Sequence, residues 1–307
     1  MIEIIDDTHW HSLRAKHIGG SEVAALFGLS PFLTAFTLWH EKAGLADSGI
    51  EENDRMRWGK MLEPLVAGEV GRKLDWTLEP SRVYHRHPTV TGMGCTLDFN
   101  VIDHQWGPGI VETKVVFDYA DYMRDWSENR APPSYELQVQ HQLACTGREW
   151  AAIAVWVAQT ATLAPALIRR PNARVIGQIE ERVAAFWQSI ADKRAPDPAG
   201  TEGELELMRE LWPAREPKKI VEIADAKLSD ACQQLLWASG QIPGLEREKT
   251  ANKAKLLAAA KDAELMRVPN YDVSIKQNVK GHIRLDVRET PDNGVIAEAS
   301  PSTILAA

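Results

Sequence analysis

Cysteine is scarce in this chain, and the three that occur, Cys95, Cys145 and Cys232, are scattered without a CxxC pair. Zinc ribbons and iron–sulfur centres bind through closely spaced cysteines, so this spacing argues against both and fits a reducing cytoplasm. The sequence also lacks an apolar run long enough to cross a membrane. Its first residues, MIEIIDDTHW, carry acids where a secretory signal peptide carries bases, so we expect neither secretion nor membrane insertion.

An excess of positive charge is also missing, since 35 lysines and arginines face 43 acids and the net charge is −8. Nucleic-acid phosphates are held by basic side chains, so any DNA-binding surface has to be local. Apolar residues make up 44% of the 307 positions, which is ample for a buried core. The length suits one large domain or a core with an appendage.

Two acids and a lysine stand out near the middle of the sequence. Asp98 lies in GCTLDFNVI, and Glu112 and Lys114 lie in IVETKVV, with the turn formers DHQWGPG between them. The β-branched and aromatic residues on both sides predict a β-hairpin. Glu112 and Lys114 leave the same face of their strand, which Asp98 of the partner strand can reach. This convergence suits a divalent cation, an attacking water and a scissile phosphate, and the alternative is a surface hairpin with an exposed ion pair.

The remaining patterns predict helices and strands around this hairpin. Helices are expected at 8–28 (two short ones separated by Ile18-Gly19-Gly20, the second capped by Ser21), 35–43, 54–73, 135–145 and 172–193. Further strands are expected at 83–87, 150–158 and 164–169. A break at RAPDPAGTEGE ends the core near residue 200. Beyond it we expect a helical stretch over 225–266, interrupted at Ser239-Gly240 and Pro243-Gly244, then strands at 271–276 and 282–287 and a frayed end.

Six motifs in one order resemble those of the phage λ-exonuclease-like and YqaJ-type viral recombinase nucleases, which belong to the PD-(D/E)xK, or restriction-endonuclease-like, superfamily. The motifs are WHSLR at 10–14, IGGSEVAALFG at 18–28, RWGKMLE at 57–63, TLDF at 96–99, VETK at 111–114 and ELQVQHQL at 136–143. Each piece alone recurs by chance, but six in register are specific. Leucine stands before Asp98 where the superfamily name has proline, and many members vary there.

The resemblance implies an α/β fold: a restriction-endonuclease-like core over residues 1–200, with a central mixed β-sheet flanked by helices, and a mainly helical extension over 201–307 that ends in a β-hairpin. It implies a Mg²⁺-dependent deoxyribonuclease, with Mn²⁺ as a substitute ion, that degrades linear double-stranded DNA from the 5′ end and leaves 3′ overhangs. The expected partners are DNA ends, a single-strand-annealing protein of phage-type recombination and other copies of the chain in a ring-shaped trimer. The expected location is the cytoplasm of a bacterial or phage-infected cell.

The resemblance also assigns the metal site. Asp98, Glu112 and the main-chain carbonyl of Thr113 would bind Mg²⁺, which prefers oxygen ligands and keeps several waters. The ion would polarise the phosphate and lower the pKa of the attacking water. Lys114 would position that water and offset the developing negative charge.

By the same resemblance, two further side chains would form a second wall of this site. Glu63 corresponds to the family's helix carboxylate and would bind a metal-bound water or a second ion, with a solvated glutamate on a helix surface as the alternative. Gln138 matches the glutamine of the family's QVQ motif and is expected to contact the water or the phosphate. Gln142 lies one helical turn further on. For Gln142, and for Tyr135, a structural role is at least as plausible.

Arg14 and Ser21 resemble the family's pocket for the terminal 5′ phosphate, and Thr96 matches a small hydroxyl residue near the metal. Arginine binds phosphate through two parallel hydrogen bonds, and the helix N-terminus at Ser21 would add N–H donors and a favourable dipole. Such a pocket would explain digestion from a 5′ end. The alternatives are a surface salt bridge for Arg14 and an ordinary helix cap for Ser21.

Three other functions compete with the exonuclease. A DNA endonuclease with structure or sequence specificity would use the same acids, but the Arg14 and Ser21 region favours an enzyme that binds ends. A catalytically inactive DNA-binding relative is disfavoured by the intact acid–acid–lysine set. An iron–sulfur nuclease is disfavoured by the scattered cysteines.

Overall fold

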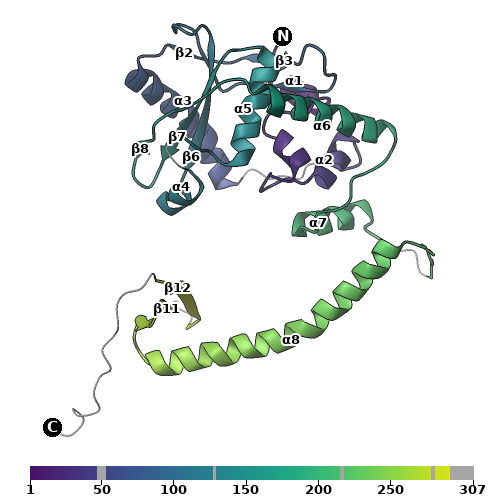
Figure 1. Ribbon diagram of the computed structural model, residues 1–307, viewed down its shortest axis with the longest axis vertical. Helices are drawn as coiled ribbons and strands as arrows, with labels where there is room; N and C mark the ends of the chain where they lie inside the picture. The colour runs from purple at the N-terminus through teal and green to yellow at the C-terminus, as the bar shows by residue number, and fades with distance from the viewer. Residues whose placement is uncertain (47–52, 127–128, 215–217, 278–280, 291–307) are drawn as a thin grey trace, which may run out of the picture. The chain divides into compact units, whose positions relative to one another are not determined.

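The computed structural model describes residues 1–46, 53–126, 129–214, 218–277 and 281–290 (Figure 1). The chain divides into two compact units, Met1–Pro217 and Lys218–Ala307. The first unit extends past residue 200 because it includes α7 (Glu202–Leu211), a helix that the sequence patterns did not predict. The buried carboxylate of Glu204 ties α7 to the rest of this unit by accepting a hydrogen bond of 2.6 Å from the Thr34 hydroxyl.

A mixed six-stranded sheet forms the centre of the first unit, as the sequence predicts. Its strands are β2 (Leu78–Pro80), β5 (Phe99–Val101), β6 (Gly109–Val116), β7 (Ala151–Val157), β8 (Thr162–Leu163) and β9 (Leu167–Arg169). β5 and β6 are antiparallel, with Phe99 opposite Val111, so the predicted hairpin is confirmed. β6 and β7 are parallel, with Glu112 opposite Ile153.

Helices cover both faces of the sheet, and the alternation along β6 assigns its side chains to them (Figure 1). Ile110 packs into the hydrophobic cluster that contains residues of α5 (Pro133–Thr146) and α6 (Ala173–Ala191). Val111 packs into a second cluster with residues of α3 (Asp54–Leu74). Since Glu112 is two positions beyond Ile110, it lies on the α5 side of the sheet.

The other elements of this unit are short. They are β1 (Ile2–Glu3), β3 (Val83–Arg86) and β4 (Gly94–Cys95) in a three-stranded sheet, and the helices α1 (Asp7–Ala15), η1 (Val23–Phe27), α2 (Ala35–Lys42) and α4 (Tyr119–Asp125). The predicted second helix within 8–28 is only the five-residue 3-10 helix η1.

Local chemistry explains where α5 begins and ends. Pro133 stands at the first helical position, where a missing N–H costs nothing, and Gly147 ends the helix with a φ of 68°, a conformation that glycine adopts without strain. The middle of α5 is buried, including the polar residues Gln138, His141 and Gln142. Buried polar side chains need hydrogen-bond partners, so this helix points to a polar site within the unit.

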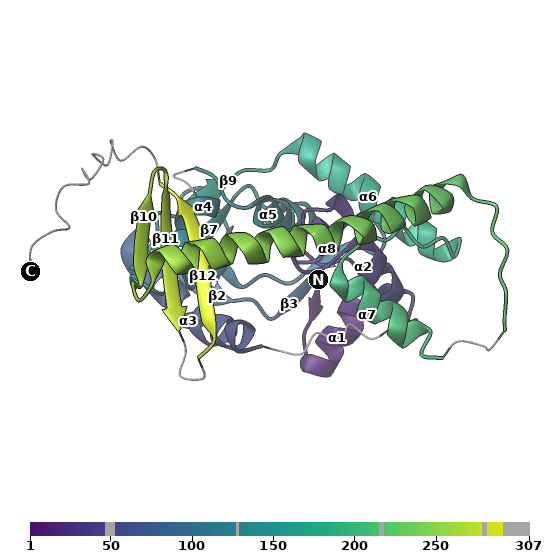
Figure 2. The same ribbon diagram turned by 90° about the horizontal axis from the view of Figure 1, so that it is seen from below.

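The second unit contains one long helix and a small sheet (Figure 2). α8 (Ala226–Ala260) is continuous, so the predicted interruptions at Ser239-Gly240 and Pro243-Gly244 are wrong; a proline removes a single N–H donor, and the alanine, leucine and lysine around it favour the helix. The helix also ends earlier than predicted. β10 (Leu265–Val268), β11 (Tyr271–Gln277) and β12 (Ile283–Glu289) form an antiparallel sheet that includes the predicted last pair of strands.

The frayed end predicted for the last residues lies outside the described part of the chain. Among the helices that the structure describes, none has the length and apolar character needed to span a membrane.

Candidate active site

Glu112 of β6 is the centre of the candidate site. Its carboxylate is 1% exposed and accepts three hydrogen bonds from side chains. Lys114 Nζ and Gln138 Nε2 lie 2.5 and 2.6 Å from Oε1, and Gln142 Nε2 lies 2.6 Å from Oε2. One cation and two amides therefore hold this carboxylate in a single orientation. The structure shows the Gln138 amide bonded to Glu112, and its contact with water or phosphate stays a prediction.

Asp98 approaches Glu112 from the end of β5. Its Oδ2 accepts hydrogen bonds from the backbone N–H of Thr113 at 2.9 Å and from the Thr113 hydroxyl at 3.0 Å. Burial raises the pKa of Asp98 to about 7, and the negative charges of Glu112 and Glu63 add to the effect. Burial and the neighbouring carboxylates therefore both disfavour the ionised form of Asp98.

Glu63 of α3 comes from the other side of the hairpin. Burial, followed by the charge of Glu112, raises the pKa of its carboxyl group, while Lys114 opposes this. The helix carboxylate predicted from the sequence therefore senses the same charges as Asp98. Glu63 on α3, Asp98 just before β5 and Glu112 on β6 therefore lie close enough for the charge of Glu112 to raise the pKa of the other two acids.

Lys114 is the cation among these acids, and its side chain is 18% exposed. Burial disfavours its charged form, but Glu112 and Asp98 outweigh that effect and raise its pKa above the usual value. The ring of Tyr135, on α5, lies 4.8 Å from the Lys114 ammonium and adds a cation–π contact. Lys114 is thus held from two sides and remains charged at neutral pH.

The carboxylates of Asp98 and Glu112 fit a divalent ion that binds through two carboxylates and keeps several waters. Within the residues that the structure describes, no three His, Cys, Asp or Glu side chains form a closed metal-binding group. Mg²⁺ does not require one, because it binds through one or two carboxylates and keeps several waters. Burial, together with the charges of Glu112 and Glu63, raises the pKa of Asp98, and a bound divalent cation would favour its ionised form. Asp98 and Glu112 would be its ligands, with the predicted Thr113 carbonyl beside them on β6.

Arg14 of α1 lies in a separate polar cluster. Its guanidinium donates to Glu22 Oε1 at 2.6 Å and lies over the ring of Trp10 at 4.8 Å. The second oxygen of Glu22 accepts from Lys42 Nζ at 2.9 Å and from the Gly19 N–H at 2.8 Å. The alternative expected for Arg14 was a surface salt bridge, but neither Glu22 nor Lys42 was predicted as its partner.

The prediction that Ser21 caps a helix is wrong. Glu22 occupies the cap position of η1, with no hydrogen bond from a capping side chain, and Ser21 is exposed. Glu22 instead turns back to the Gly19 amide and to two cations, which bind a carboxylate more strongly than a helix end does. A five-residue 3-10 helix also supplies little of the dipole that was expected to attract a phosphate.

Backbone contact links this N-terminal cluster to the helix behind Glu112. A Cβ atom on Gly20 would lie 3.3 Å from Cγ of Gln138 and 3.5 Å from Cγ of Gln142. A side chain at this position would need Gln138 or the segment 18–22 to move by a few tenths of an ångström, so glycine favours the close approach to α5. Thr96, predicted near the metal, is half-buried next to the same helix, and its carbonyl accepts a longer hydrogen bond of 3.4 Å from Gln142.

Comparison with known families agrees with this arrangement. Residues 9–149 match the family model described as the YqaJ-like viral recombinase domain. The chain is thus similar to this family over somewhat less than half of its length. The predicted resemblance to YqaJ-type proteins is therefore confirmed, and the matched residues include every side chain that the sequence analysis placed in the site.

Similarity to one curated relative extends beyond the YqaJ-like domain. The chain is 25% identical over 286 residues to the uncharacterized protein YqaJ of Bacillus subtilis (strain 168), which is 92% of this chain and 86% of that protein. A match of this extent includes residues of the second unit.

Solved structures with similarity to the chain include an alkaline exonuclease, LHK-Exo, from Laribacter hongkongensis. It is 21% identical, with a TM-score of 0.48, and the match covers 66% of this chain and 96% of that one. The same exonuclease in complex with dAMP is 19% identical, with a TM-score of 0.46, and covers 65% and 94% of the two chains.

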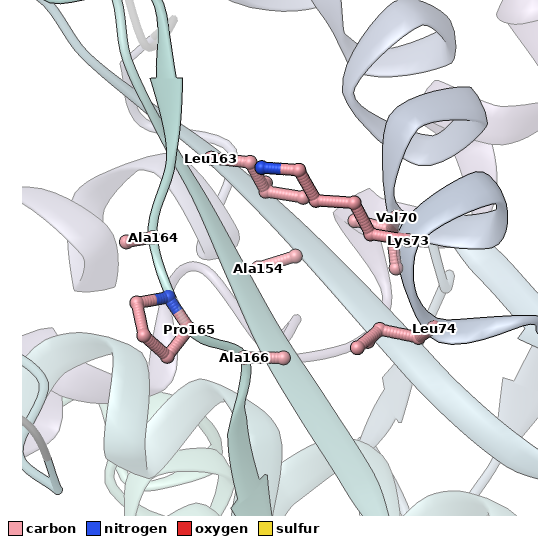
Figure 3. Close-up of a pocket in the computed structure, with 8 residues that line it drawn as sticks. All are labelled: Val70, Lys73, Leu74, Ala154, Leu163, Ala164, Pro165 and Ala166. Atoms are coloured by element: carbon pink, nitrogen blue, oxygen red, sulfur yellow. The ribbon is translucent and has the colours of Figure 1, made fainter.

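A small pocket of about 160 Å³ lies outside the candidate site (Figure 3). Val70, Lys73 and Leu74 of α3 face Ala154 of β7 and the segment 163–166 across it. Its walls are apolar apart from Lys73, and none of the acids discussed above lines it. The acids around Glu112 therefore lie apart from this pocket.

Proposed function

We propose that this protein is a Mg²⁺-dependent deoxyribonuclease. The observation that carries the proposal is the convergence of Glu63, Asp98, Glu112 and Lys114 at one end of the β5–β6 hairpin. These groups lie in a domain whose family is described as a viral recombinase, and recombination acts on DNA. Paired carboxylates with an adjacent ammonium provide what phosphodiester hydrolysis needs, namely ligands for a metal ion and a positive charge near the reacting phosphate.

Each side chain has a distinct part in the proposed reaction. Mg²⁺, or Mn²⁺ in its place, would polarise the scissile phosphate and lower the pKa of the attacking water. Asp98 and Glu112 would hold the ion, with Glu63 on a metal-bound water. Lys114 would orient the attacking water and offset the charge that develops on the phosphate, and its contact with Tyr135 restricts it to the side facing the acids.

Gln138 and Gln142 would orient the Glu112 ligand. Both amides donate to its carboxylate from consecutive turns of α5, so each oxygen of Glu112 has a fixed direction. A ligand that is already oriented loses little entropy when a metal binds, and hydrogen bonds of this kind commonly tune metal affinity.

We infer further that the enzyme digests linear double-stranded DNA in the 5′-to-3′ direction and leaves a 3′ overhang for an annealing protein. The support is the partly exposed Arg14 guanidinium, which is bonded to Glu22, the residue after the exposed Ser21. A terminal phosphate bound there would be fixed relative to Glu112, because Gly20 of the same segment packs on the helix that holds Glu112.

A digestion experiment with three substrates tests the proposal. Linear duplexes labelled at one end, with either a 5′ phosphate or a 5′ hydroxyl, are compared with covalently closed circular DNA, each with Mg²⁺ or with EDTA. Loss of nucleotides from the 5′ strand of the linear duplex only, and only with Mg²⁺, is the expected result. Cleavage of the circle would assign an endonuclease, and binding without cleavage of any substrate would assign an inactive relative.

We also propose that several copies of the chain assemble, with a trimer as the expected form. The supporting observation is a set of large apolar side chains on α8 that are each about half exposed or more, namely Leu228, Leu235, Leu236, Trp237 and Ile242. An isolated helix is marginally stable in water, and exposed apolar side chains of this size usually mark an association surface. A second copy of the chain offers the same apolar row and is the partner we assign.

A further inference from the structure

Glu22 is a buried carboxylate with no part in the proposed hydrolysis. Its side chain is 9% exposed and lies between two cations, Arg14 at 2.6 Å and Lys42 at 2.9 Å. The Gly19 N–H adds a third donor at 2.8 Å. Lys42 also donates to the backbone carbonyl of Arg14 at 2.7 Å, so the helices that carry these two cations, α1 and α2, are joined at this point.

Glu22 faces two cations, and the negative charge of Glu41 also acts on Lys42. The two cations differ in their access to solvent: the Lys42 side chain is 5% exposed and that of Arg14 is 30% exposed. Burial alone would raise the pKa of Glu22, but Arg14 and Lys42 outweigh it and bring the pKa below the usual value. Glu22 is therefore ionised at neutral pH, and of its two cations Arg14 is the one with access to solvent.

The geometry leaves part of the Arg14 guanidinium available. Arginine has five N–H donors in a rigid plane, and the bond to Glu22 comes from the NH2 nitrogen alone. Trp10 supports one face of the plane at 4.8 Å. With one edge attached to Glu22 and one face on Trp10, the direction of the remaining donors is set.

The same short segment connects this cluster to Glu112. Glu22 holds the amide of Gly19, and the next residue, Gly20, lies against Gln138 and Gln142 on α5. Those two amides hold the Glu112 carboxylate. A shift of Glu22 would thus move both Arg14 and the packing surface of the helix that orients the predicted metal ligand.

We propose that Glu22 is a positioning residue that fixes Arg14 for the terminal 5′ phosphate of DNA and thereby sets the preference for phosphorylated ends. The proposal rests on the proposed function, because it requires that DNA ends are the substrate. It assigns no contact between Glu22 and DNA. Glu22 acts through Arg14, and Lys42 supplies the charge that keeps Glu22 ionised and in place.

Substitution of Glu22 by glutamine separates positioning from simple electrostatics. Glu22→Gln removes a negative charge beside Arg14, so charge alone predicts tighter binding of a phosphate. A glutamine, however, offers one acceptor oxygen, and its NH₂ group would face one of the two cations, so it cannot hold Arg14 and Lys42 together. Positioning therefore predicts weaker discrimination, the opposite sign.

The experiment measures binding of the full-length protein to short duplexes with a 5′ phosphate or a 5′ hydroxyl, in EDTA so that no cleavage occurs. We expect Glu22→Gln to reduce the ratio of the two dissociation constants about tenfold, the range for one charge-assisted hydrogen bond. Glu69→Gln, which makes the same charge change in an exposed pair with Arg72, should leave the ratio unchanged. In an Arg14→Ala background, Glu22→Gln should cause no further loss, since its effect passes through Arg14.

Each other outcome has one meaning. An unchanged or increased preference in Glu22→Gln overturns the positioning role, and an increase would mean that Glu22 competes with the phosphate. Equal binding of both ends by the wild-type protein would overturn the recognition of 5′ phosphates. Absence of Mg²⁺-dependent cleavage would instead overturn the proposed hydrolysis at Lys114 and the neighbouring acids. Should Glu22→Gln not fold, Glu22→Asp keeps the charge but shortens the reach, and the same reduction is expected.

Discussion

Gln142 Nε2 donates a hydrogen bond of 2.6 Å to Glu112 Oε2, across the interface between α5 and the central sheet. Gln138, one helical turn earlier, donates to the other oxygen. Because a single helix face holds both oxygens, the direction of the Glu112 carboxylate depends on where α5 lies. The position of α5 depends in turn on the N-terminal segment at Gly20 that packs against it.

Removal of the Gln142 amide should reduce activity more than stability. Its own carbonyl oxygen is buried without a hydrogen-bond partner within the described residues, so Gln142→Met removes one unsatisfied acceptor along with the donor to Glu112. We expect kcat to fall about 10- to 100-fold, as for other residues that orient metal ligands, with a shift in Tm of a few degrees at most. Gln140→Met is the control, since its amide bonds Arg170 and Asn172 away from Glu112, and it should leave kcat unchanged.

Lys114→Ala should abolish Mg²⁺-dependent cleavage and leave DNA binding largely intact. The ammonium is the only cation bonded to Glu112 among the described side chains, and its loss removes the charge that would stabilise the transition state. A decrease of about 10³-fold or more in kcat is expected, measured with saturating linear duplex, and binding is measured separately in EDTA. Full activity in this variant would remove the assignment of Glu112 and Asp98 as the catalytic centre.

Gly20→Ala should lower activity through packing alone. The new methyl group would lie 3.3 Å from Cγ of Gln138 and 3.5 Å from Cγ of Gln142, so α5 or the segment has to move by a few tenths of an ångström. We expect about a tenfold loss in kcat, because small displacements of a positioned group are costly in catalysis, with Tm lowered by several degrees. Gly68→Ala on α3, where nothing lies within 4 Å, is the matched control and should retain activity. Equal activity in both variants would contradict the link between the segment and Glu112.

The sequence predicted the hairpin and its acids well because those signals are local. Glu112 and Lys114 are two residues apart on one strand, so their side chains share a face. The turn residues before them fix the strand pairing. The partners of Arg14 had no such signal, because Lys42 lies on another helix and no spacing rule connects the two positions. Glu22 likewise had no sequence signal for its inward direction, which follows from tertiary contacts with two cations.

Two other differences have different origins. The scattered cysteines Cys95 and Cys145 are buried and lie close enough for a side-chain hydrogen bond, a proximity that sequence distance conceals. In α8, the rule that proline and glycine interrupt helices predicted breaks that do not occur. That error is a local one, because the helix-favouring residues on both sides of Pro243 outweigh its missing N–H donor.

Stability should fall in mild acid because of His85. Burial, with a contribution from Arg148, lowers the pKa of this side chain to about 4 in the folded protein, against 6.5 in the unfolded chain. As the pH falls below 6.5, the unfolded state binds the proton first, so stability is lost progressively down to about pH 4. Between pH 7.5 and pH 5, we expect the free energy of unfolding of His85→Gln to fall by about 1–2 kcal/mol less than that of the wild type. Urea unfolding at the two pH values measures this difference. Parallel pH profiles for the two proteins would show that His85 titrates normally in the folded state.

Charge placed on the apolar row of α8 should dissociate the assembly. Leu228, Leu235 and Ile242 recur every seven residues, which places them in one line along the helix, and they are 49%, 69% and 51% exposed. In contact with a second copy, a lysine at Leu235 would bring a buried charge into the interface, which is unfavourable by several kcal/mol. We expect light scattering to give a mass of several 34.2 kDa chains for the wild type and of one chain for Leu235→Lys. Gln234→Lys, an equally charged change at the neighbouring exposed position, should keep the wild-type mass, and a wild type that is monomeric at micromolar concentration would reject α8 as a self-association surface.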